Sequence, residues 1–108
     1  IHKTVKKGDV LKINEARGVA KLSILLELCV PFVKMNRTMV ALKGKNGHEE
    51  LLNAKKAIDT LGVELVDEEK FMIEEDATRI NLYFKKVKHT PSKYPRAYGQ
   101  IKKKPLEG

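Results

Sequence analysis

The sequence contains one cysteine, no tryptophan and only 6% aromatic residues among its 108 positions. Because the lone Cys29 cannot form an internal disulfide, a disulfide-stapled fold is excluded and a reducing, cytoplasmic compartment is favoured. No apolar run approaches the roughly 20 residues of a membrane span. The longest run, residues 24–33, is interrupted by Glu27. We therefore expect a cytoplasmic protein without a membrane span.

The sequence also lacks an initiating methionine, because it begins at Ile1. No predicted element precedes its first strand. We interpret the chain as a piece of a longer protein, with a processed or tag-cleaved complete protein as the alternative. At this length we expect one domain with a modest hydrophobic core.

Basic residues are in excess, and they gather toward the C-terminal end. The formal net charge is +8, and residues 85–108 carry eight Lys or Arg with a single acid, Glu107. This segment therefore has a charge of +7, which leaves +1 for residues 1–84. A near-neutral body with a basic tail favours a polyanionic partner, most simply a nucleic acid. A disordered, solubilising tail explains the same composition equally well.

Hydrophobic periodicity predicts the order β-α-β-α-β-β, which indicates an α/β fold with a mainly parallel sheet and an antiparallel strand near its edge. Apolar residues at helical spacing follow Lys21, and the continuous apolar run from Thr38 is typical of a strand buried on both faces. The predicted elements are a strand at 9–13, a helix over 21–33, a strand at 38–42, a helix at 49–61, and strands at 63–66 and 79–84.

Single residues predict where these elements end. Pro31 removes a backbone donor and should end or kink the first helix. Asn36 suits a left-handed turn after it, and Gly62 suits the stop of the second helix. Seven acids fall between Glu64 and Asp76. We interpret them as the solvated ends of a hairpin. Metal binding is the alternative, which is disfavoured because no metal-ligand spacing is evident.

The junction between the first strand and the first helix carries a charged pair, Glu15 and Arg17, beside Gly18. Open α/β sheets place ligand-contacting groups at such junctions, where a helix N-terminus supplies unpaired N–H groups. The predicted loop after the next strand contains Lys43 and Lys45. These lysines either meet RNA phosphate on the same side of the sheet or lie in a solvated loop.

The tail, residues 89–108, interleaves basic and aromatic residues with prolines that oppose regular structure. Tyrosines beside lysine and arginine offer base stacking together with phosphate contact. Alternatively, the tyrosines pin the tail to the body, a role that suits Tyr94 better because Pro95 follows it. The predicted RNA contacts are Lys93, Arg96, Lys102, Lys103 and Lys104.

The tail motif is specific enough to indicate a family. It reads Thr90-Pro91-Ser92-Lys93-Tyr94-Pro95-Arg96-Ala97-Tyr98-Gly99, closed by Lys103-Lys104-Pro105-Leu106. This motif closely resembles the C-terminal signature of the glucose-inhibited division protein B family, the small-subunit (16S) rRNA guanine-N7 methyltransferases. The segment Ala16-Arg17-Gly18-Val19-Ala20 resembles the family's Ala-Arg-Ala-Val-Ala motif, with Gly18 in place of alanine. The likeness covers the chain from about Asp9 to Leu106.

The resemblance implies the C-terminal half of a class I methyltransferase with a Rossmann-like sheet. It implies S-adenosyl-L-methionine as cofactor, with Arg17 against it, and ribosomal RNA of the small subunit as partner. A structural salt bridge, for example to Glu15, is the alternative role for Arg17.

Two features depart from the family pattern. Asn36-Arg37 stands where a glycine pair is common. The Gly-rich cofactor loop and the acidic ribose-binding strand, which the family carries in its N-terminal half, are missing from this sequence. We therefore expect a pocket that the missing N-terminal half completes, and a piece that is inactive alone.

No catalytic residue or metal ligand is predicted. Guanine N7 carries a free lone pair at neutral pH, so its attack on a methyl sulfonium needs alignment rather than a general base. The scattered His2, His48 and His89 are expected in exposed loops, and Cys29 in the core. The alternatives to an enzyme are a non-catalytic RNA-binding α/β module with a basic tail, and an assembly domain whose tail docks on a partner subunit.

Overall fold

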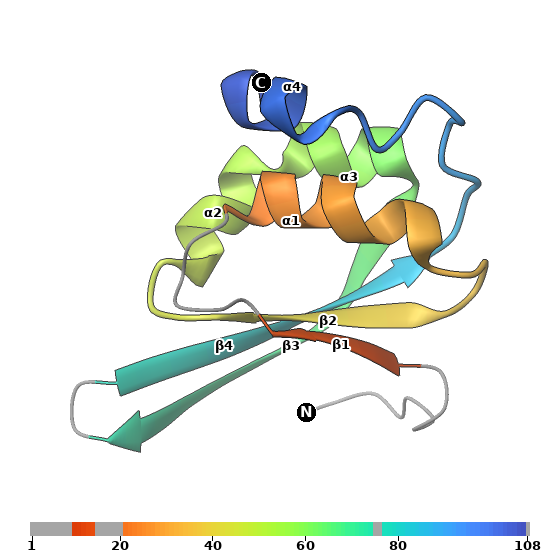
Figure 1. The fold of residues 1–108 in the computed structure, drawn as a ribbon. Coiled ribbons are helices and arrows are strands. Elements are labelled where there is room, and N and C mark those ends of the chain that lie inside the picture. Colours follow the sequence, from red (N-terminus) through yellow and green to blue (C-terminus); the bar gives the residue numbers. More distant parts are fainter. Residues whose placement is uncertain (1–9, 15–20, 75–76, 108) are drawn as a thin grey trace.

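A four-stranded sheet carries all the described helices on one of its faces (Figure 1). The computed structural model describes residues 10–14, 21–74 and 77–107. The sheet has the spatial order β1-β2-β4-β3. Its strands are β1 (Val10–Asn14), β2 (Thr38–Lys43), β3 (Val63–Glu74) and β4 (Ala77–Lys86).

One strand of this sheet runs against the others. Strands β1 and β2 are parallel, with Asn14 opposite Leu42 at their carboxyl ends. Strand β4 is antiparallel to β2 on one side and to β3 on the other, so β1, β2 and β3 share a direction. The predicted α/β sheet with an antiparallel strand near its edge is confirmed, and β4 lies one place in from that edge. The sheet is less parallel than predicted, because of the described pairings only β1–β2 is parallel, whereas β4 is antiparallel to both of its neighbours.

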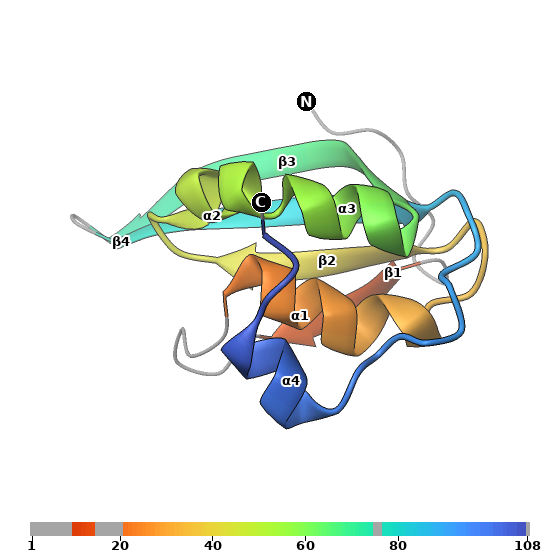
Figure 2. The same ribbon diagram turned by 90° about the horizontal axis from the view of Figure 1, so that it is seen from above.

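The helices form a layer with α1 at its centre. They are α1 (Leu22–Cys29), the short 3-10 helix η3 (Val30–Phe32), α2 (Gly47–Asn53), α3 (Lys55–Leu61) and α4 (Tyr98–Lys103). Helix α1 contacts α2, α3 and α4. Helix α4 lies on the outer flank of α1, beside its N-terminal half (Figure 2). The tail thereby returns to the part of the body where β1 and β2 end.

The hydrophobic core fills the space between this layer and the sheet. Side chains alternate along β4, so Ile80, Leu82 and Phe84 point toward the helices, and all three are buried. Leu22 and Leu26 of α1 are fully buried in the same cluster. Burial of each such side chain contributes about 1.5–3 kcal/mol. The apolar stripe seen in the sequence is therefore what fixes α1 on the sheet.

The signals for element ends are confirmed. Helix α1 ends at Cys29, and Pro31 lies in η3 directly after it. Asn36 has a φ of 68°, in the left-handed region, and Gly62 ends α3 with a φ of 87°.

Several predicted elements differ from the structure in extent or number. The helix expected at 49–61 is two helices, α2 and α3, which meet at Ala54. The loop expected at 43–48 is shorter, because Lys43 belongs to β2 and α2 begins at Gly47. The tail, despite its prolines, contains α4, whose buried Ile101 anchors it on the body. At α4, tertiary packing through Ile101 outweighs the local sequence preference.

The acidic segment belongs to a hairpin of β3 and β4, as predicted, but most of it lies within β3, which extends far beyond the strand expected at 63–66. Strand β3 runs from Val63 to Glu74, and within the described sheet it pairs only with β4. Charged side chains suit such an edge strand because they discourage pairing with another chain. Glu69 accepts hydrogen bonds at Oε1 from the Tyr83 hydroxyl (2.7 Å) and Asn81 Nδ2 (3.2 Å). Burial and the bond to Glu69 raise the pKa of Tyr83 to about 12.

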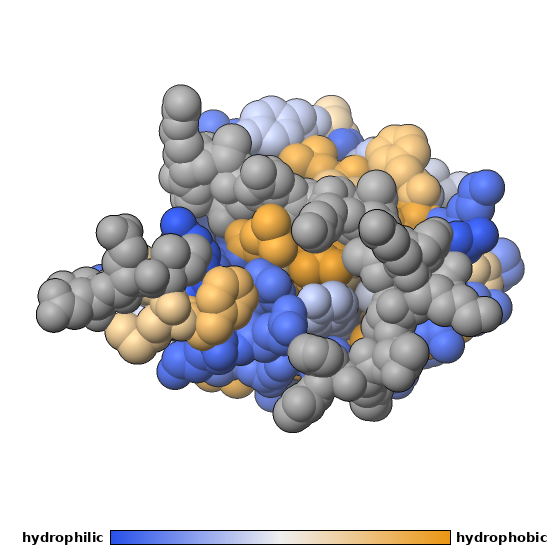
Figure 3. Space-filling model, turned by 90° about the horizontal axis from the view of Figure 1, so that it is seen from below, coloured by the Kyte–Doolittle hydropathy of each residue, from blue (hydrophilic) through white to orange (hydrophobic). Residues whose placement is uncertain are grey.

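The face of the sheet opposite the helices carries both apolar and polar side chains (Figure 3). Asn81 and Tyr83 lie on this face, because they alternate with the core residues of β4. The described helices leave this face uncovered, whereas the core face is closed by α1 to α3.

Substitution of Gly62 by alanine tests the turn between α3 and β3. A Cβ at this position would meet the Lys88 carbonyl oxygen at 2.6 Å in a backbone conformation that L side chains rarely adopt. Gly62→Ala should therefore lower the free energy of unfolding by more than about 1 kcal/mol, as measured by urea denaturation.

The matched control is Gly99→Ala, because a Cβ at Gly99, in helix α4, would meet no atom within 4 Å. This change should leave stability equal or raise it by about 0.5–1 kcal/mol, since alanine favours a helix. Equal effects of the two substitutions would contradict the assignment of a special role to Gly62.

Candidate nucleic-acid interface

The basic tail is folded onto the helical layer along its length. At its start, Thr90 Oγ1 donates a hydrogen bond to the Leu61 carbonyl oxygen at 2.7 Å. Tyr94 packs against the core, and Ile101 and Leu106 are buried. The tail is thus an ordered part of the structure, and the structural role proposed for Tyr94 is confirmed.

The strongest link between tail and body is an ion pair between Arg96 and Glu27 of α1. Arg96 Nη2 lies 2.7 Å from Glu27 Oε1, and its Nε lies 2.9 Å from Glu27 Oε2. The Arg96 backbone N–H also donates to Glu27 Oε2 at 3.0 Å. Such a two-point pairing is the strongest arrangement that a guanidinium and a carboxylate adopt. Arg96 Nη2 further donates to the Lys104 carbonyl oxygen at 2.9 Å, which ties the end of α4 to the same arginine.

Glu27 is a charged group inside the structure. Its side chain has 0% exposure, whereas the Arg96 side chain is 23% exposed. Burial raises the pKa of the Glu27 carboxyl, but the hydrogen bonds and positive charge of Arg96 outweigh that effect and hold the pKa below its ordinary value. The hydrogen bonds to Glu27 raise the pKa of Arg96 in turn. Both groups are therefore ionised at neutral pH.

The lysines predicted to contact RNA are on the surface. Lys102, Lys103 and Lys104 come at the end of α4 and just beyond it, and all three are exposed. Lys93 is exposed, and its ammonium lies 5.3 Å from the centre of the Tyr94 ring. Lys102 lies 5.7 Å from the Tyr98 ring, which is 53% exposed. The structure therefore brings three of the predicted lysines together, next to an exposed aromatic ring.

Arg96 differs from these lysines because its donors point into the protein. Its Nε, one of its terminal nitrogens and its backbone N–H are bonded to Glu27 or to the Lys104 carbonyl. A direct contact between Arg96 and RNA stays a prediction. What the geometry shows is a structural partner for Arg96, which the sequence did not predict.

The carboxyl ends of β1 and β2 form a second region of interest. The junction with Glu15, Arg17 and Gly18 lies outside the described residues, so their predicted roles remain predictions. At the same edge, the Leu22 N–H of α1 donates to Glu50 Oε1 at 2.8 Å. The ammonium of Lys43 lies 2.8 Å from that same oxygen.

Lys43 is not the exposed loop residue that the sequence predicted. Its side chain is 1% exposed and pairs with Glu50, because Lys43 belongs to β2 and lies on the buried side of the sheet. Lys45, in the turn that follows, is exposed. The burial of Lys43 leaves Lys45 as the residue of this predicted pair whose contact with RNA stays a prediction.

Glu27 was missed as a functional candidate, although it carries a visible signal. It is the single charged residue in the apolar run 24–33. A charge at a core position needs a partner of opposite sign, and here that partner comes from the tail. Ser23, also buried on α1, likewise holds the tail by donating to Glu107 Oε2 at 2.8 Å.

Other candidate chemistry is limited in the described ranges. Residues 10–14, 21–74 and 77–107 contain no group of three or more His, Cys, Asp or Glu that could hold a metal ion. Burial raises the pKa of the Cys29 thiol, in keeping with the predicted packing role. His48 lies in α2 rather than in a loop, and it is exposed and contacts Glu68 on β3. None of the helices in these ranges is long and apolar enough to cross a membrane.

The chain is similar to curated bacterial proteins named ribosomal RNA small subunit methyltransferase G. It is 49% identical over 97 residues to the one from Bacillus subtilis (strain 168), a match that covers 89% of this chain. It is 46% identical over 96 residues to that of Geobacillus sp. (strain WCH70), and 41% identical over 93 residues to that of Clostridium tetani (strain Massachusetts / E88), covering 88% and 85% of this chain. Over these residues, the chain belongs to this family. No protein-family model matches it.

The matches cover only part of each family member. The chain spans 41% of the Bacillus subtilis protein, 40% of the Geobacillus protein and 39% of the Clostridium tetani protein. The matched region is their C-terminal part. The α/β architecture described above agrees with part of a Rossmann-like methyltransferase sheet, as the sequence predicted.

Replacement of Glu27 by glutamine tests the ion pair through its pH dependence. The folded-state pKa of Glu27 is lowered from an ordinary value of 4.5. Its ionised form therefore stabilises the fold fully above that pH, and the contribution is lost as the pH falls through the folded-state pKa. Glu27→Gln should lower the free energy of unfolding at pH 7 by about 3 kcal/mol. Urea denaturation at pH 7, 5 and 3 should show this difference shrinking toward the acid end.

Glu49→Gln is the control, because Glu49 is an exposed acid in the first turn of α2. Its effect should stay below about 1 kcal/mol, as expected for a charge near a helix N-terminus. A stability difference for Glu27→Gln that stays constant from pH 7 to pH 3 would contradict the pairing of an ionised Glu27.

Proposed function

We propose that this chain is part of a methyltransferase that transfers a methyl group from S-adenosyl-L-methionine to guanine N7 in small-subunit ribosomal RNA. The observation that carries the proposal is the 41–49% identity to relatives named for methylation of that RNA. The guanine-N7 assignment rests on the resemblance of the tail motif. The proposal places the protein in the cytoplasm.

The sheet edge where β1 and β2 end is the proposed cofactor region. Parallel strands form a crevice at their carboxyl ends, and α1 begins at this same edge. We assign Arg17, at this junction, to contact with the cofactor. The proposed pocket is completed by residues in the part of the relatives that this chain does not span, namely the missing N-terminal half.

Methyl transfer to guanine N7 requires the protein to align the two reactants, and it requires no proton transfer by a side chain. Guanine N7 is a lone-pair nucleophile at neutral pH, so the methyl group moves when N7 and the methyl carbon are held in line. Positive charge moves from the cofactor to the base during transfer, and the surrounding dipoles accommodate it. No residue of this chain is assigned a general-base role.

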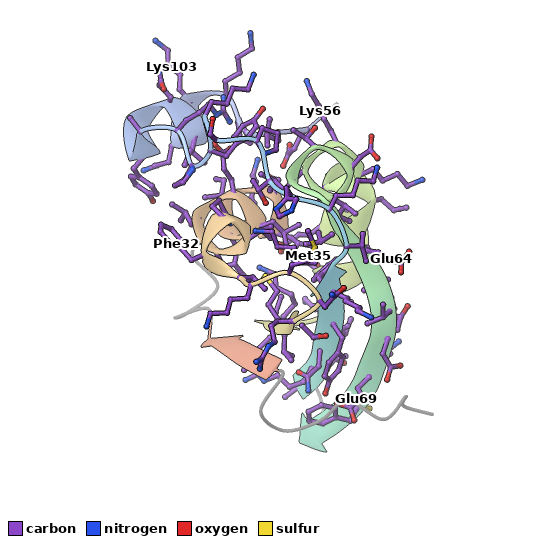
Figure 4. All side chains as sticks on the ribbon, turned by 90° about the vertical axis from the view of Figure 1, so that its right-hand side faces the viewer. Phe32, Met35, Lys56, Glu64, Glu69 and Lys103 are labelled. Carbon is purple, nitrogen blue, oxygen red and sulfur yellow. The ribbon has the colours of Figure 1, made fainter. Side chains whose placement is uncertain are left out.

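The surface around α4 is the proposed RNA-binding site. Lys102, Lys103 and Lys104 form a cluster of positive charge, and Lys103 points away from the body (Figure 4). Phosphate contacts by lysine supply affinity without sequence preference. Tyr98, exposed beneath Lys102, is placed to stack on an unpaired base. Lys93 extends this surface along the tail.

Neutralisation of the cluster tests the RNA-binding proposal. The triple variant Lys102→Gln, Lys103→Gln and Lys104→Gln should bind small-subunit ribosomal RNA more weakly at every sequence tested. The slope of log affinity against log salt concentration should fall by about 2, since each lost contact to single-stranded RNA removes roughly 0.7. Filter binding from about 50 to about 300 mM KCl measures the slope.

The matched control replaces Lys55, Lys56 and Lys70 with glutamine, which removes the same charge from α3 and β3. These lysines are exposed, and Lys56 points away from α3, on a different part of the surface from Lys103 (Figure 4). The control should keep most of the wild-type slope. If both triple variants lose the same slope, the α4 surface is not a specific RNA site.

Titration with S-adenosyl-L-methionine tests the proposal that this chain forms only part of the cofactor pocket. Calorimetry should detect no binding to this chain alone at concentrations up to about 1 mM. A chimera that places the unmatched N-terminal part of the Bacillus subtilis relative before this chain should bind. Arg17→Gln in the chimera should weaken binding about tenfold or more, the loss expected for one charged hydrogen bond.

Tight binding by the chain alone would contradict the proposed incomplete pocket. Unchanged affinity in the Arg17→Gln chimera would show that Arg17 is structural. RNA binding combined with no cofactor binding in a folded chimera would favour the alternative function, a non-catalytic RNA-binding module.

A further inference from the structure

Helix α4 depends on tertiary contacts for its stability and its position. It has six residues, and a helix this short is not stable in water without tertiary contacts. Of its residues, only Ile101 is buried. The location of Lys102, Lys103 and Lys104 is therefore set by the burial of Ile101 together with contacts that other tail residues make.

The Glu27–Arg96 pair is the contact best placed to fix α4. Arg96 comes just before the helix, and its guanidinium joins Glu27 on α1 to the Lys104 carbonyl at the far end of α4. One side chain thus links the body to both ends of the lysine-bearing segment. Ser23 secures the residues beyond α4 through Glu107, but this single hydrogen bond involves no positive charge.

We propose that Glu27 and Arg96 are positioning residues for RNA binding, which hold the lysines of α4 beside the N-terminal half of α1. This proposal rests on the RNA-binding function proposed above. In that function, the ion pair keeps the lysine-bearing surface in a fixed position. Figures 1 and 2 place α4 on the side of the molecule where β1 and β2 end, which is the proposed site of methyl transfer.

The physical reason is pre-organisation. Binding of RNA by a released tail would have to order the backbone and the lysine side chains at the moment of contact, and that ordering weakens affinity. In the folded tail this ordering has already taken place. A fixed position of α4 also fixes the distance between RNA phosphates and the sheet edge, so it affects which base reaches that edge.

Charge provides a sharp test, because Glu27 is negative and fully buried. Glu27 cannot touch RNA, and simple electrostatics predicts that its neutralisation strengthens binding to a polyanion. A positioning role for Glu27 predicts instead that its neutralisation weakens RNA binding. Glu27→Gln should weaken RNA binding about tenfold, because the released segment must be ordered again on binding. The measurement is filter binding with small-subunit ribosomal RNA at fixed salt.

The double variant Glu27→Gln with Arg96→Gln removes the pair without changing the net charge. It leaves no unpaired buried ion, so it is the safer variant if Glu27→Gln alone fails to fold. It should also bind RNA about tenfold more weakly than the wild-type chain. Lys93→Gln is the comparison for a lost tail charge, and it should have the smaller effect.

Hydrogen exchange separates release of the tail from global unfolding. The Ile101 and Lys104 amides, which donate to Ala97 and Gln100, should lose protection in the double variant. The amides that pair β2 with β4 should keep theirs.

The outcomes distinguish this proposal from the one it rests on. If Lys102→Gln, Lys103→Gln and Lys104→Gln leave the salt slope unchanged, the proposed RNA-binding surface fails. If those lysines matter but the double variant binds as tightly as wild type, only the positioning role is overturned. Equal or tighter binding by a folded Glu27→Gln variant would overturn it as well.

Discussion

A buried carboxylate is the constraint on which the helical layer depends. Glu27 lies on α1 with no exposed surface, and α1 contacts α2, α3 and α4. An ion in such a position destabilises the fold unless its charge and its oxygen lone pairs are satisfied. Arg96 does both, through its guanidinium and its backbone N–H. The body therefore requires its tail, and the tail is positioned by the body.

This requirement gives a physical meaning to the tail motif. Thr90, Tyr94 and Arg96 contact the body, while Lys93 and Tyr98 face solvent. The motif thus combines residues that fold the segment with residues that are free to meet a partner. Such a sequence motif is specific because some of its positions must pack against the body while neighbouring positions must remain available to a partner.

Local patterns predicted most of the elements but not how distant segments pair. The stripe after Lys21, the left-handed turn at Asn36 and the stop at Gly62 are features of short segments, and the structure confirms them. Helix α4 was missed because it depends on tertiary contacts, such as the burial of Ile101, rather than on local helix propensity. Burial of Lys43 was missed because its partner, Glu50, belongs to a different element.

In the candidate site, too, the sequence predicted local features but not the pairing of distant residues. The exposure of Lys93 and of Lys102 to Lys104 follows from composition, and the sequence predicted these lysines as RNA contacts. The partner of Arg96 lies 69 residues away, on another element, and no periodicity in either segment indicates it. A charge inside an apolar run, such as Glu27, shows that a partner is needed without showing where it is.

The place of β4 in the sheet has a consequence for biosynthesis. Among the described strands it is the last to leave the ribosome, yet it lies between β2 and β3 and pairs with both. A nascent chain that ends before Ala77 therefore presents two open strand edges at once, one on β2 and one on β3. Such edges are templates for pairing with other chains. These two edges stay open until residues 77–86 have been made, and a single strand then closes both.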